Sequence, residues 1–256
     1  MPDHRERLVG LLRPGTTPTG AAEGFLDLLG EITQAGPPTG LAQRLMSTSA
    51  VPMIYERYWR PVLGRVAKGL NCPSMAGEVR IAIEALGLRP GQISLDVACG
   101  TGRFTRAFGE AVGPDGLSIG LDGSVTMLEK ALAEPNPASV AYLRADAVDL
   151  PLADSTVDGV CCFAALHMFA DPDAALDSFA RVLKPGGSLV LLTSARHSDQ
   201  PMRLADTFLG RLSGQRMFDR GEISRKLFRR GFDHVEERFS GVTQIVTGAL
   251  PVNIRP

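Results

Sequence analysis

The sequence predicts an α/β fold: a doubly wound, Rossmann-like sheet of seven strands, mostly parallel, with an antiparallel C-terminal hairpin and an N-terminal helical extension. Three observations support this prediction. Between residues 76 and 195, short apolar runs alternate with helical patterns of ~10 residues, which is typical of right-handed βαβ units. After Gly231, two strand patterns follow each other across a short turn, as in an antiparallel hairpin. Finally, the run at 93–97 leads directly into a Gly-x-Gly turn and a helical pattern.

The individual elements follow from periodicity and from turn residues. Helices are expected where apolar residues recur on one face and a capping residue or turn bounds the segment, at 78–86, 104–112, 124–133, 173–183 and 222–230. The turns Gly113-Pro114-Asp115-Gly116 and Lys184-Pro185-Gly186-Gly187 interrupt the helical patterns. Strands are expected in the short strand-like segments at 93–97, 117–121, 140–144, 157–163, 188–193, 235–239 and 242–250.

The chain divides into two regions. Residues 1–75 are expected to form a helical extension or lid, in which Phe25, Leu28, Leu29 and Ile32 recur at the spacing of an amphipathic helix. The Gly- and Pro-rich segment 34–40 cannot continue that helix. Residues 76–256 are expected to form the main domain, with an insert at 198–218 that has an apolar helical face.

Composition excludes several classes of protein. A chain of 256 residues with 44% hydrophobic content can bury the core of one α/β domain with an appendage. The net charge of -1 gives no sign of a polyanion-binding surface, so no nucleic-acid partner is expected. The four cysteines lack the spacing of a zinc site, and no metal-ligand set is visible. With no apolar run of ~18 residues and no leader pattern, we expect no transmembrane segment and a cytoplasmic location.

The Gly-x-Gly turn indicates a nucleotide-like ligand. Asp96 ends the apolar run, and Gly100 and Gly102 let the backbone approach a ligand closely. A dinucleotide fingerprint needs a third glycine, but that position is Thr105. No Lys-Ser/Thr pair follows the glycines, so the phosphate-binding P-loop is also absent.

Two more acids follow the next two predicted strands. Asp122 comes about twenty residues after Gly102, where a carboxylate can accept both hydroxyls of a ribose. Asp146 comes after the third strand and can accept from an adenine amino group, and Met127 can pack on the purine face. Open α/β sheets bind ligands at the carboxyl ends of their strands, so we expect these side chains to share one site.

With these motifs, the chain resembles the class I S-adenosylmethionine-dependent methyltransferases. LDVACGTG is similar to their first motif, GLDGS to the acidic end of their second strand, and ADAVDLPLADSTVD to the segment before their fourth strand. ALHMFADPDAALDSFARVLKPGGSLVL resembles the exit of that strand, the next helix and the following turn. The resemblance covers residues 76–250 and is to the small-molecule branch that contains the ubiquinone/menaquinone-type (methyltransferase type 11) enzymes. It implies S-adenosylmethionine as methyl donor and S-adenosylhomocysteine as product.

The resemblance also implies roles for individual residues. The methionyl part of the cofactor would contact Asp96, Ala98, Gly100 and Gly102, although Asp96 has the alternative of bonding the loop that follows it. The ribose would lie at Asp122 and Gly123, the adenine at Ala145, Asp146, Ala147 and Met127, and the methyl-donor end at Phe163.

Methyl transfer is expected as an in-line displacement on a small-molecule acceptor, with an O or C nucleophile. His167 is the candidate general base, with a pKa expected near the working pH, and packing is its alternative role. Candidate acceptor contacts are Tyr55, Tyr58, Trp59, His167, His197 and Phe208. The apolar face of the insert suits a lipophilic or ring-containing acceptor, and it equally suits a dimer interface, so a monomer and a homodimer both remain open.

Two other functions remain as alternatives. A cofactor-binding regulatory or scaffold subunit would keep the glycines and both acids but lack turnover. A protein or RNA methyltransferase is the second, although an Asn/Asp-Pro-Pro-Tyr motif is missing at Phe163-Ala164-Ala165-Leu166-His167. The acceptor atom is open among O, N and C.

Overall fold

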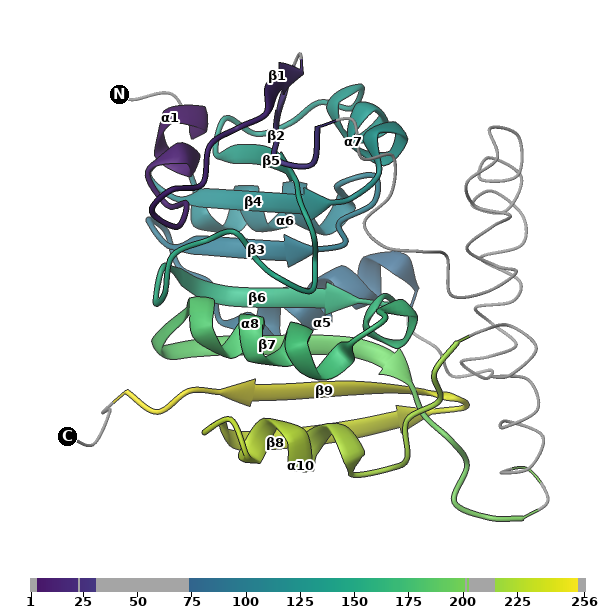
Figure 1. Ribbon diagram of the computed structural model, residues 1–256. Helices are drawn as coiled ribbons and strands as arrows, with labels where there is room; N and C mark the ends of the chain where they lie inside the picture. Colours follow the sequence, from purple (N-terminus) through teal and green to yellow (C-terminus); the bar gives the residue numbers. More distant parts are fainter. Residues whose placement is uncertain (1–3, 23, 31–73, 201, 203–214, 253–256) are drawn as a thin grey trace.

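A mixed sheet of nine strands forms the centre of the molecule in the computed structural model, which describes residues 4–22, 24–30, 74–200, 202 and 215–252 (Figure 1). The order across the sheet is β1-β2-β5-β4-β3-β6-β7-β9-β8. In chain order the strands are β1 (Gly20–Ala22), β2 (Phe25–Asp27), β3 (Ile93–Val97), β4 (Leu117–Asp122), β5 (Val140–Arg144), β6 (Val157–Phe163), β7 (Leu183–Ser194), β8 (Asp233–Ser240) and β9 (Thr243–Ala249).

The seven strands expected from sequence are all present and adjacent, from β5 to β8. The pairs among β5, β4, β3, β6 and β7 are parallel, and β9 runs antiparallel to both β7 and β8. The chain moves outward from β3 to β5, then returns to β6 on the other side of β3, which creates a topological switch point between β3 and β6. The predicted doubly wound fold is confirmed, with β1 and β2 added at one edge.

Helices cover both faces of the sheet. In Figure 1, α5 (Met75–Leu86) and α6 (Arg103–Val112) lie behind the sheet, whereas α8 (Pro172–Val182) and α10 (Glu222–Phe228) lie in front. The helix α7 (Val125–Leu132) packs over β4 and β5, and α1 (His4–Val9) contacts β5. Along β6, Val160 and Cys162 join the core on one face, and Cys161 and Phe163 join the core on the other. This alternation follows the pleat of the strand and gives both cysteines a packing role.

Local capping explains where helices begin. The hydroxyl of Ser124 accepts the backbone N–H of Met127, which starts α7 at the expected residue. The carboxylate of Asp171 accepts the N–H groups of Asp173 and Ala174 and starts α8, with Pro172 in its first turn. No helix of the described residues is long and apolar enough to cross a bilayer.

The amphipathic helix predicted around Phe25–Ile32 is wrong at its beginning. Phe25–Asp27 is strand β2, which pairs with β1 on one side and with β5 on the other. Phe25 and Leu26 are both buried but enter different core clusters, so these apolar residues follow the period of a strand. The rest of the predicted extension, at 31–73, lies outside the described residues, as does most of the 198–218 insert with its predicted apolar helical face.

Candidate functional site

The loops that carry the predicted site residues meet at one edge of the sheet. Strands β3, β4, β5 and β6 are parallel neighbours, and the arrowheads of β3, β4 and β6 point the same way in Figure 1. The segments after these strands are 96–102, 122–124, 145–147 and 163–167. They flank the switch point between β3 and β6, where open α/β sheets bind their ligands.

The turn after β3 is built from left-handed backbone. Ala98, Gly100 and Gly102 have φ of 57°, 55° and 73°. A Cβ on Gly102 would collide with the hydroxyl of Tyr142 and lie 2.9 Å from its Cζ, so this glycine is required by packing beneath the loop. A Cβ on Gly100 would meet no atom within 4 Å. Gly100 therefore faces open space, which is where a ligand can approach the backbone.

Asp96 lies under this loop and bonds to the helix that follows. It is 2% exposed, and its Oδ2 accepts the hydroxyl of Thr105 at 2.6 Å. Burial raises the pKa of Asp96 to about 7, the hydroxyl and backbone N–H of Thr105 oppose that rise, and the nearby Asp122 adds to it. The alternative predicted for Asp96 was bonding to the amides of the loop that follows it, whereas the contact observed is with Thr105, in the first turn of α6.

Thr105 itself was not predicted as a site residue. In the sequence it counted only as a missing glycine, yet its buried side chain holds Asp96 and its carbonyl accepts the hydroxyl of Ser118 at 2.8 Å. Gly120 makes room for it, because a Cβ there would lie 2.8 Å from the Thr105 hydroxyl. The signal in the sequence is a hydroxyl residue nine positions after the acid, in the first turn of the helix.

Asp122 connects two of the strand-end loops. Its Oδ2 accepts the N–H of Gly100 at 2.9 Å, and its Oδ1 accepts the N–H of Ser124 at 2.9 Å. Burial raises the pKa of this carboxyl, while the N–H groups of Ser124, Gly100 and Gly123 oppose the rise. Each oxygen of a carboxylate can accept more than one hydrogen bond, so both remain able to accept from a ligand hydroxyl.

The remaining predicted cofactor contacts lie in the next loops of the same edge. Asp146 is half-buried, and its Oδ1 accepts the N–H of Val148 at 2.8 Å in a tight turn. Ala145 is buried and Ala147 half-buried beside it, and Met127 is half-buried in the first turn of α7. The residues after β4 and β5 are linked, since the Arg144 Nε donates to the carbonyl of Gly123 at 3.2 Å.

At the end of β6, Phe163 packs against the ring of Phe104 in helix α6. Its ring centroid lies 4.8 Å from that of Phe104, which comes from the first turn of α6. Phe163 is 9% exposed, and the following Ala164 has a φ of 57°. The chain therefore turns sharply at the end of β6, as it does after β3.

His167 lies in the short helix η2 (Leu166–Met168), next to the end of β7. Its Nδ1 is 3.4 Å from the hydroxyl of Thr193, and its carbonyl accepts the N–H of Arg216 at 2.9 Å. Burial lowers the pKa of His167 to about 4. The expected pKa near working pH is therefore wrong, because removing the ring from water disfavours its charged form.

The described end of the 198–218 insert packs on this side of the site. The Ser194 hydroxyl donates to the carbonyl of Arg216 at 2.6 Å, and the Arg196 N–H donates to the carbonyl of Phe218 at 2.8 Å. The half-buried His197 follows β7 in the same loop. The other predicted acceptor contacts, Tyr55, Tyr58, Trp59 and Phe208, lie outside the described residues.

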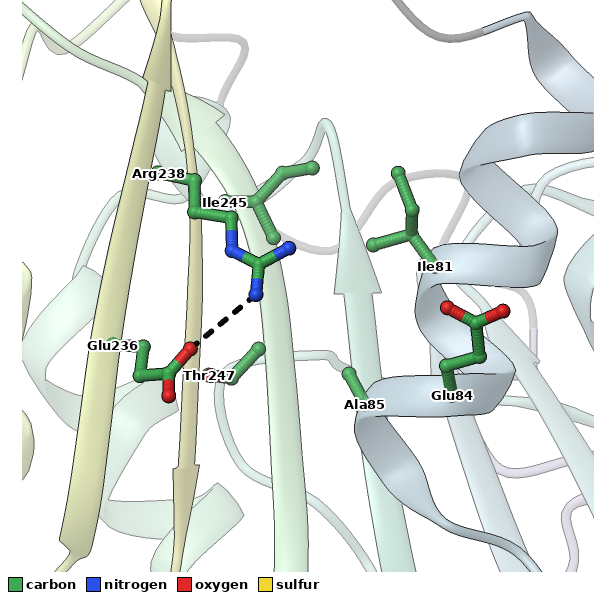
Figure 2. A pocket seen from close by; sticks show the side chains of 7 residues that line it. All are labelled: Ile81, Glu84, Ala85, Glu236, Arg238, Ile245 and Thr247. Atoms are coloured by element: carbon green, nitrogen blue, oxygen red, sulfur yellow. Dashed lines mark hydrogen bonds and ion pairs between the residues drawn. The ribbon is translucent and has the colours of Figure 1, made fainter.

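A separate cavity lies away from this edge, between α5 and the β8–β9 hairpin (Figure 2). It has a volume of about 210 Å³, with Ile81 and Ile245 facing each other and the Arg238–Glu236 ion pair on one wall. Its lining is Ile81, Glu84, Ala85, Glu236, Arg238, Ile245 and Thr247. None of these residues comes from the loops after β3, β4, β5 or β6.

The site combines an open glycine backbone with a carboxylate that can still accept hydrogen bonds. Gly100 leaves open space at the loop, and the Asp122 carboxylate lies beside it with capacity for hydroxyl donors. In the part of the chain that the structure describes, no group of three or more His, Cys, Asp or Glu side chains could hold a metal ion.

Comparisons with known proteins agree with this arrangement. Residues 95–191, from β3 into β7, match the family described as a methyltransferase domain. The chain is 35% identical over 152 residues to a demethylmenaquinone methyltransferase of Symbiobacterium thermophilum, covering 55% of this chain and 61% of that protein. It is 38% identical over 123 residues to the ubiquinone/menaquinone biosynthesis C-methyltransferase UbiE of Pseudomonas paraeruginosa, covering 46% and 48%. The chain thus spans only about half to three fifths of the length of these relatives.

A solved structure shares the fold at low sequence identity. A phosphoethanolamine N-methyltransferase of Haemonchus contortus, solved with S-adenosylhomocysteine, aligns with a TM-score of 0.64 and 16% identity, covering 85% of this chain and 61% of that one. The strand order agrees with the fold of this solved structure, and residues 95–191 match a methyltransferase domain, with sequence relatives of the ubiquinone/menaquinone type.

Proposed function

We propose that this chain transfers the methyl group of S-adenosylmethionine to a small-molecule acceptor. The observation that carries the proposal is the Asp122 carboxylate, which bridges the N–H groups of Gly100 and Ser124 across two strand-end loops. It does so beside a glycine whose Cβ position is open, inside the segment that matches a methyltransferase domain.

The strand-end loops supply complementary contacts for the two halves of the cofactor. Asp122 and Gly123 would hold the ribose, and Ala145, Asp146, Ala147 and Met127 the adenine. The open backbone around Ala98, Gly100 and Gly102 would hold the methionyl part, and Phe163 would border the methyl-donor end. Asp96 supports this loop from below through Thr105.

When bound, the cofactor would supply an electrophilic sulfonium methyl, open to in-line attack by an acceptor nucleophile, with S-adenosylhomocysteine as the leaving group. The main task of the protein is then to align the acceptor. Correct alignment can lower such a barrier by roughly 7–11 kcal/mol in the best cases. The residues available for alignment on the acceptor side are those at the ends of β6 and β7, including His167 and Thr193.

His167 remains the candidate base, although its environment makes it a weak one. With a pKa lowered to about 4, its ring is neutral at pH 7 and can accept a proton through whichever nitrogen faces the acceptor. A ring of such low basicity suits an acceptor that is itself acidic, such as a phenolic hydroxyl or the activated carbon of a hydroquinone. The Thr193 hydroxyl lies 3.4 Å from Nδ1 of this ring.

We favour a lipophilic, ring-containing acceptor, with O or C as the methylated atom. Two relatives are named for demethylmenaquinone and for ubiquinone/menaquinone C-methylation, so a hydroquinone ring carbon is the first acceptor class to test. The apolar pattern of the 198–218 insert is compatible with such a ring.

Calorimetry and turnover test the proposal in two steps. The folded chain should bind S-adenosylhomocysteine, and Asp122→Ala should weaken that binding by at least about tenfold through loss of a charged hydrogen-bond acceptor. Asp154→Ala is the control, since Asp154 is an exposed acid near the start of β6, bonded to Arg181. No binding by the wild-type chain would refute the cofactor assignment, and equal losses in the two variants would refute the role of Asp122.

The second step measures S-adenosylhomocysteine release with acceptors. A panel of hydroquinones, catechols, a peptide mixture and total RNA separates the proposed class from the protein and RNA alternatives. Release with a hydroquinone or catechol supports the proposal. Binding of the cofactor without release on any acceptor would instead support a regulatory or scaffold subunit.

A further inference from the structure

Three charged residues on neighbouring strands lie opposite one another in the sheet: Asp27 on β2, Arg144 on β5 and Asp122 on β4. In the pairing of β2 with β5, Asp27 is opposite Arg144, and in the pairing of β4 with β5, Asp122 is opposite the same Arg144. Because β2 runs parallel to β5, its C-terminal end lies at the same edge as the cofactor loops. The N-terminal segment therefore adds one more strand end beside the proposed adenosine site.

Arg144 uses its side chain to join the segments on both sides of it. Its Nη1 lies 2.9 Å from the Asp27 Oδ2 and 2.6 Å from the carbonyl oxygen of Gly30, and its Nε donates to the carbonyl of Gly123 at 3.2 Å. Its side chain is 4% exposed and that of Asp27 is 15% exposed. A guanidinium that is removed from water needs such partners, and a fork of N–H groups can reach two segments at once.

Asp27 is held in its own turn by further contacts. Its Oδ1 accepts the N–H groups of Leu29 and Gly30, and the Leu28 N–H donates to the carbonyl of Arg144. Burial raises the pKa of Asp27, but those N–H groups and the Arg144 guanidinium outweigh it, so the pKa lies below its ordinary value. The residue is therefore a fixed anion that orients Arg144.

The orientation of Arg144 matters for Asp122. The strand register places Arg144 between Asp27 and Asp122, and its guanidinium forms an ion pair with Asp27. On the other side it reaches the carbonyl of Gly123, next to Asp122, while the Asp122 oxygens accept the N–H groups of Gly100 and Ser124. Asp122 thus keeps its remaining acceptor capacity for a ligand.

We infer that Asp27 and Arg144 are positioning residues for the adenosine half of the cofactor: the pair fixes the 122–124 loop and keeps the guanidinium away from the Asp122 carboxylate. The inference rests on the proposed function, because it assumes that this loop binds the ribose. It makes β2 part of the cofactor site, although this strand is separated from the glycine loop by more than sixty residues of sequence.

The test compares Asp27→Asn with a matched control, Asp158→Asn. The Asp158 side chain is 18% exposed, forms an ion pair with Lys184 at 2.8 Å and accepts the N–H of Ile93. It lies at the start of β6, at the ends of the strands opposite to the cofactor loops. Both variants lose one partly buried ion pair, so both should lower the melting temperature. Only Asp27→Asn should raise the Kd for S-adenosylhomocysteine, by roughly tenfold.

Kinetics separate positioning from general destabilisation. With an acceptor that turns over, Asp27→Asn should raise the KM for S-adenosylmethionine and leave kcat at saturating cofactor within about twofold, because the acceptor side is untouched. Arg144→Lys is the second variant. It keeps a positive charge for Asp27 but lacks the fork that also reaches Gly123, so it should stay folded and still weaken binding.

The outcomes distinguish this inference from the proposed function. A wild-type chain that binds neither S-adenosylmethionine nor S-adenosylhomocysteine overturns both. A wild-type chain that binds, with Asp27→Asn and Arg144→Lys matching the affinity of Asp158→Asn, overturns only the positioning role. Weakened binding in Asp27→Asn and Arg144→Lys, with Asp158→Asn equal to wild type, supports it.

Discussion

The Gly100 N–H donates to the Asp122 Oδ2 at 2.9 Å, and this one bond ties the loop after β3 to the loop after β4. The two residues are 22 positions apart in sequence but lie at the ends of neighbouring parallel strands. The bond fixes the glycine loop in its left-handed conformation and places its open side next to a carboxylate. The shape of the site thus depends on the sheet that aligns these two strand ends.

Gly100→Ala should reduce cofactor affinity more than it reduces stability. Gly100 has a φ of 55° and no atom within 4 Å of its Cβ position, so the fold loses only about 1 kcal/mol from backbone strain. Gly87→Ala is the matched control, since Gly87 has a φ of 58° and an equally open Cβ position at the end of α5. Chemical denaturation should give similar losses for both variants, whereas calorimetry should show weaker S-adenosylhomocysteine binding for Gly100→Ala alone. Equal affinities would mean that the ligand does not approach this face of the loop.

Gly102→Ala should reduce stability more strongly than Gly100→Ala, because other side chains fill the space around the Cβ position of Gly102. Its Cβ would collide with the Tyr142 hydroxyl and lie 3.1 Å from the Ala131 Cβ, and its φ is 73°. We expect a loss of about 2–4 kcal/mol in the free energy of unfolding, from strain and overpacking together. Tyr142→Phe removes the colliding oxygen, so in a double-mutant cycle the combined loss should be smaller than the sum of the single losses. Additive losses would show that the tyrosine is not the obstacle.

The sequence predicted local elements well and long-range contacts poorly. Strands at 140–144 and 157–163 were predicted with the bounds that the structure has, because each is a short, mostly apolar segment set off by turn residues. The three-residue strand β2 has no such local signal, since its pairing with β5 joins residues more than a hundred positions apart. The ion pair between Asp27 and Arg144 spans 117 positions for the same reason. Periodicity alone could therefore not distinguish a helix from a short strand around Phe25.

In the candidate site, too, the local features were predicted well and the long-range contacts poorly. The acids at 96, 122 and 146 were found because each lies at or just after the end of a predicted strand, and neighbouring parallel strands end at one edge. Thr105 was missed as a contact because its partner is chosen by how α6 packs over β3, which spacing does not give. The low pKa of His167 was missed for a related reason: burial is a property of the surrounding fold and not of the local sequence.

Asp96 should make stability depend on pH. Its pKa rises from 3.8 to about 7 on folding, chiefly through burial, so the folded chain holds a proton that the unfolded chain releases. The contribution of Asp96 is therefore fully favourable below about pH 4 and is lost as pH rises toward about 7. Relative to Asp96→Asn, the wild-type free energy of unfolding should fall by up to about 4 kcal/mol across that window. Urea unfolding of both proteins at several pH values measures the difference, and a difference that does not vary with pH would contradict the raised pKa.

His167 should remain neutral throughout the pH range in which the enzyme would work. Burial lowers its pKa from 6.5 to about 4, so its imidazole signals in NMR spectra, assigned with His167→Gln, should not titrate between about pH 5.5 and 8. The rate of methyl transfer should accordingly lack an acidic limb near pH 6.5 from this residue. The effect of pH on the free energy of unfolding is opposite in direction to that of Asp96. The unfolded chain takes up the proton first, so His167 opposes folding as pH falls from about 6.5 to about 4. A titration midpoint near 6.5 would show that the ring stays in contact with water, and it would restore His167 as a base of ordinary strength.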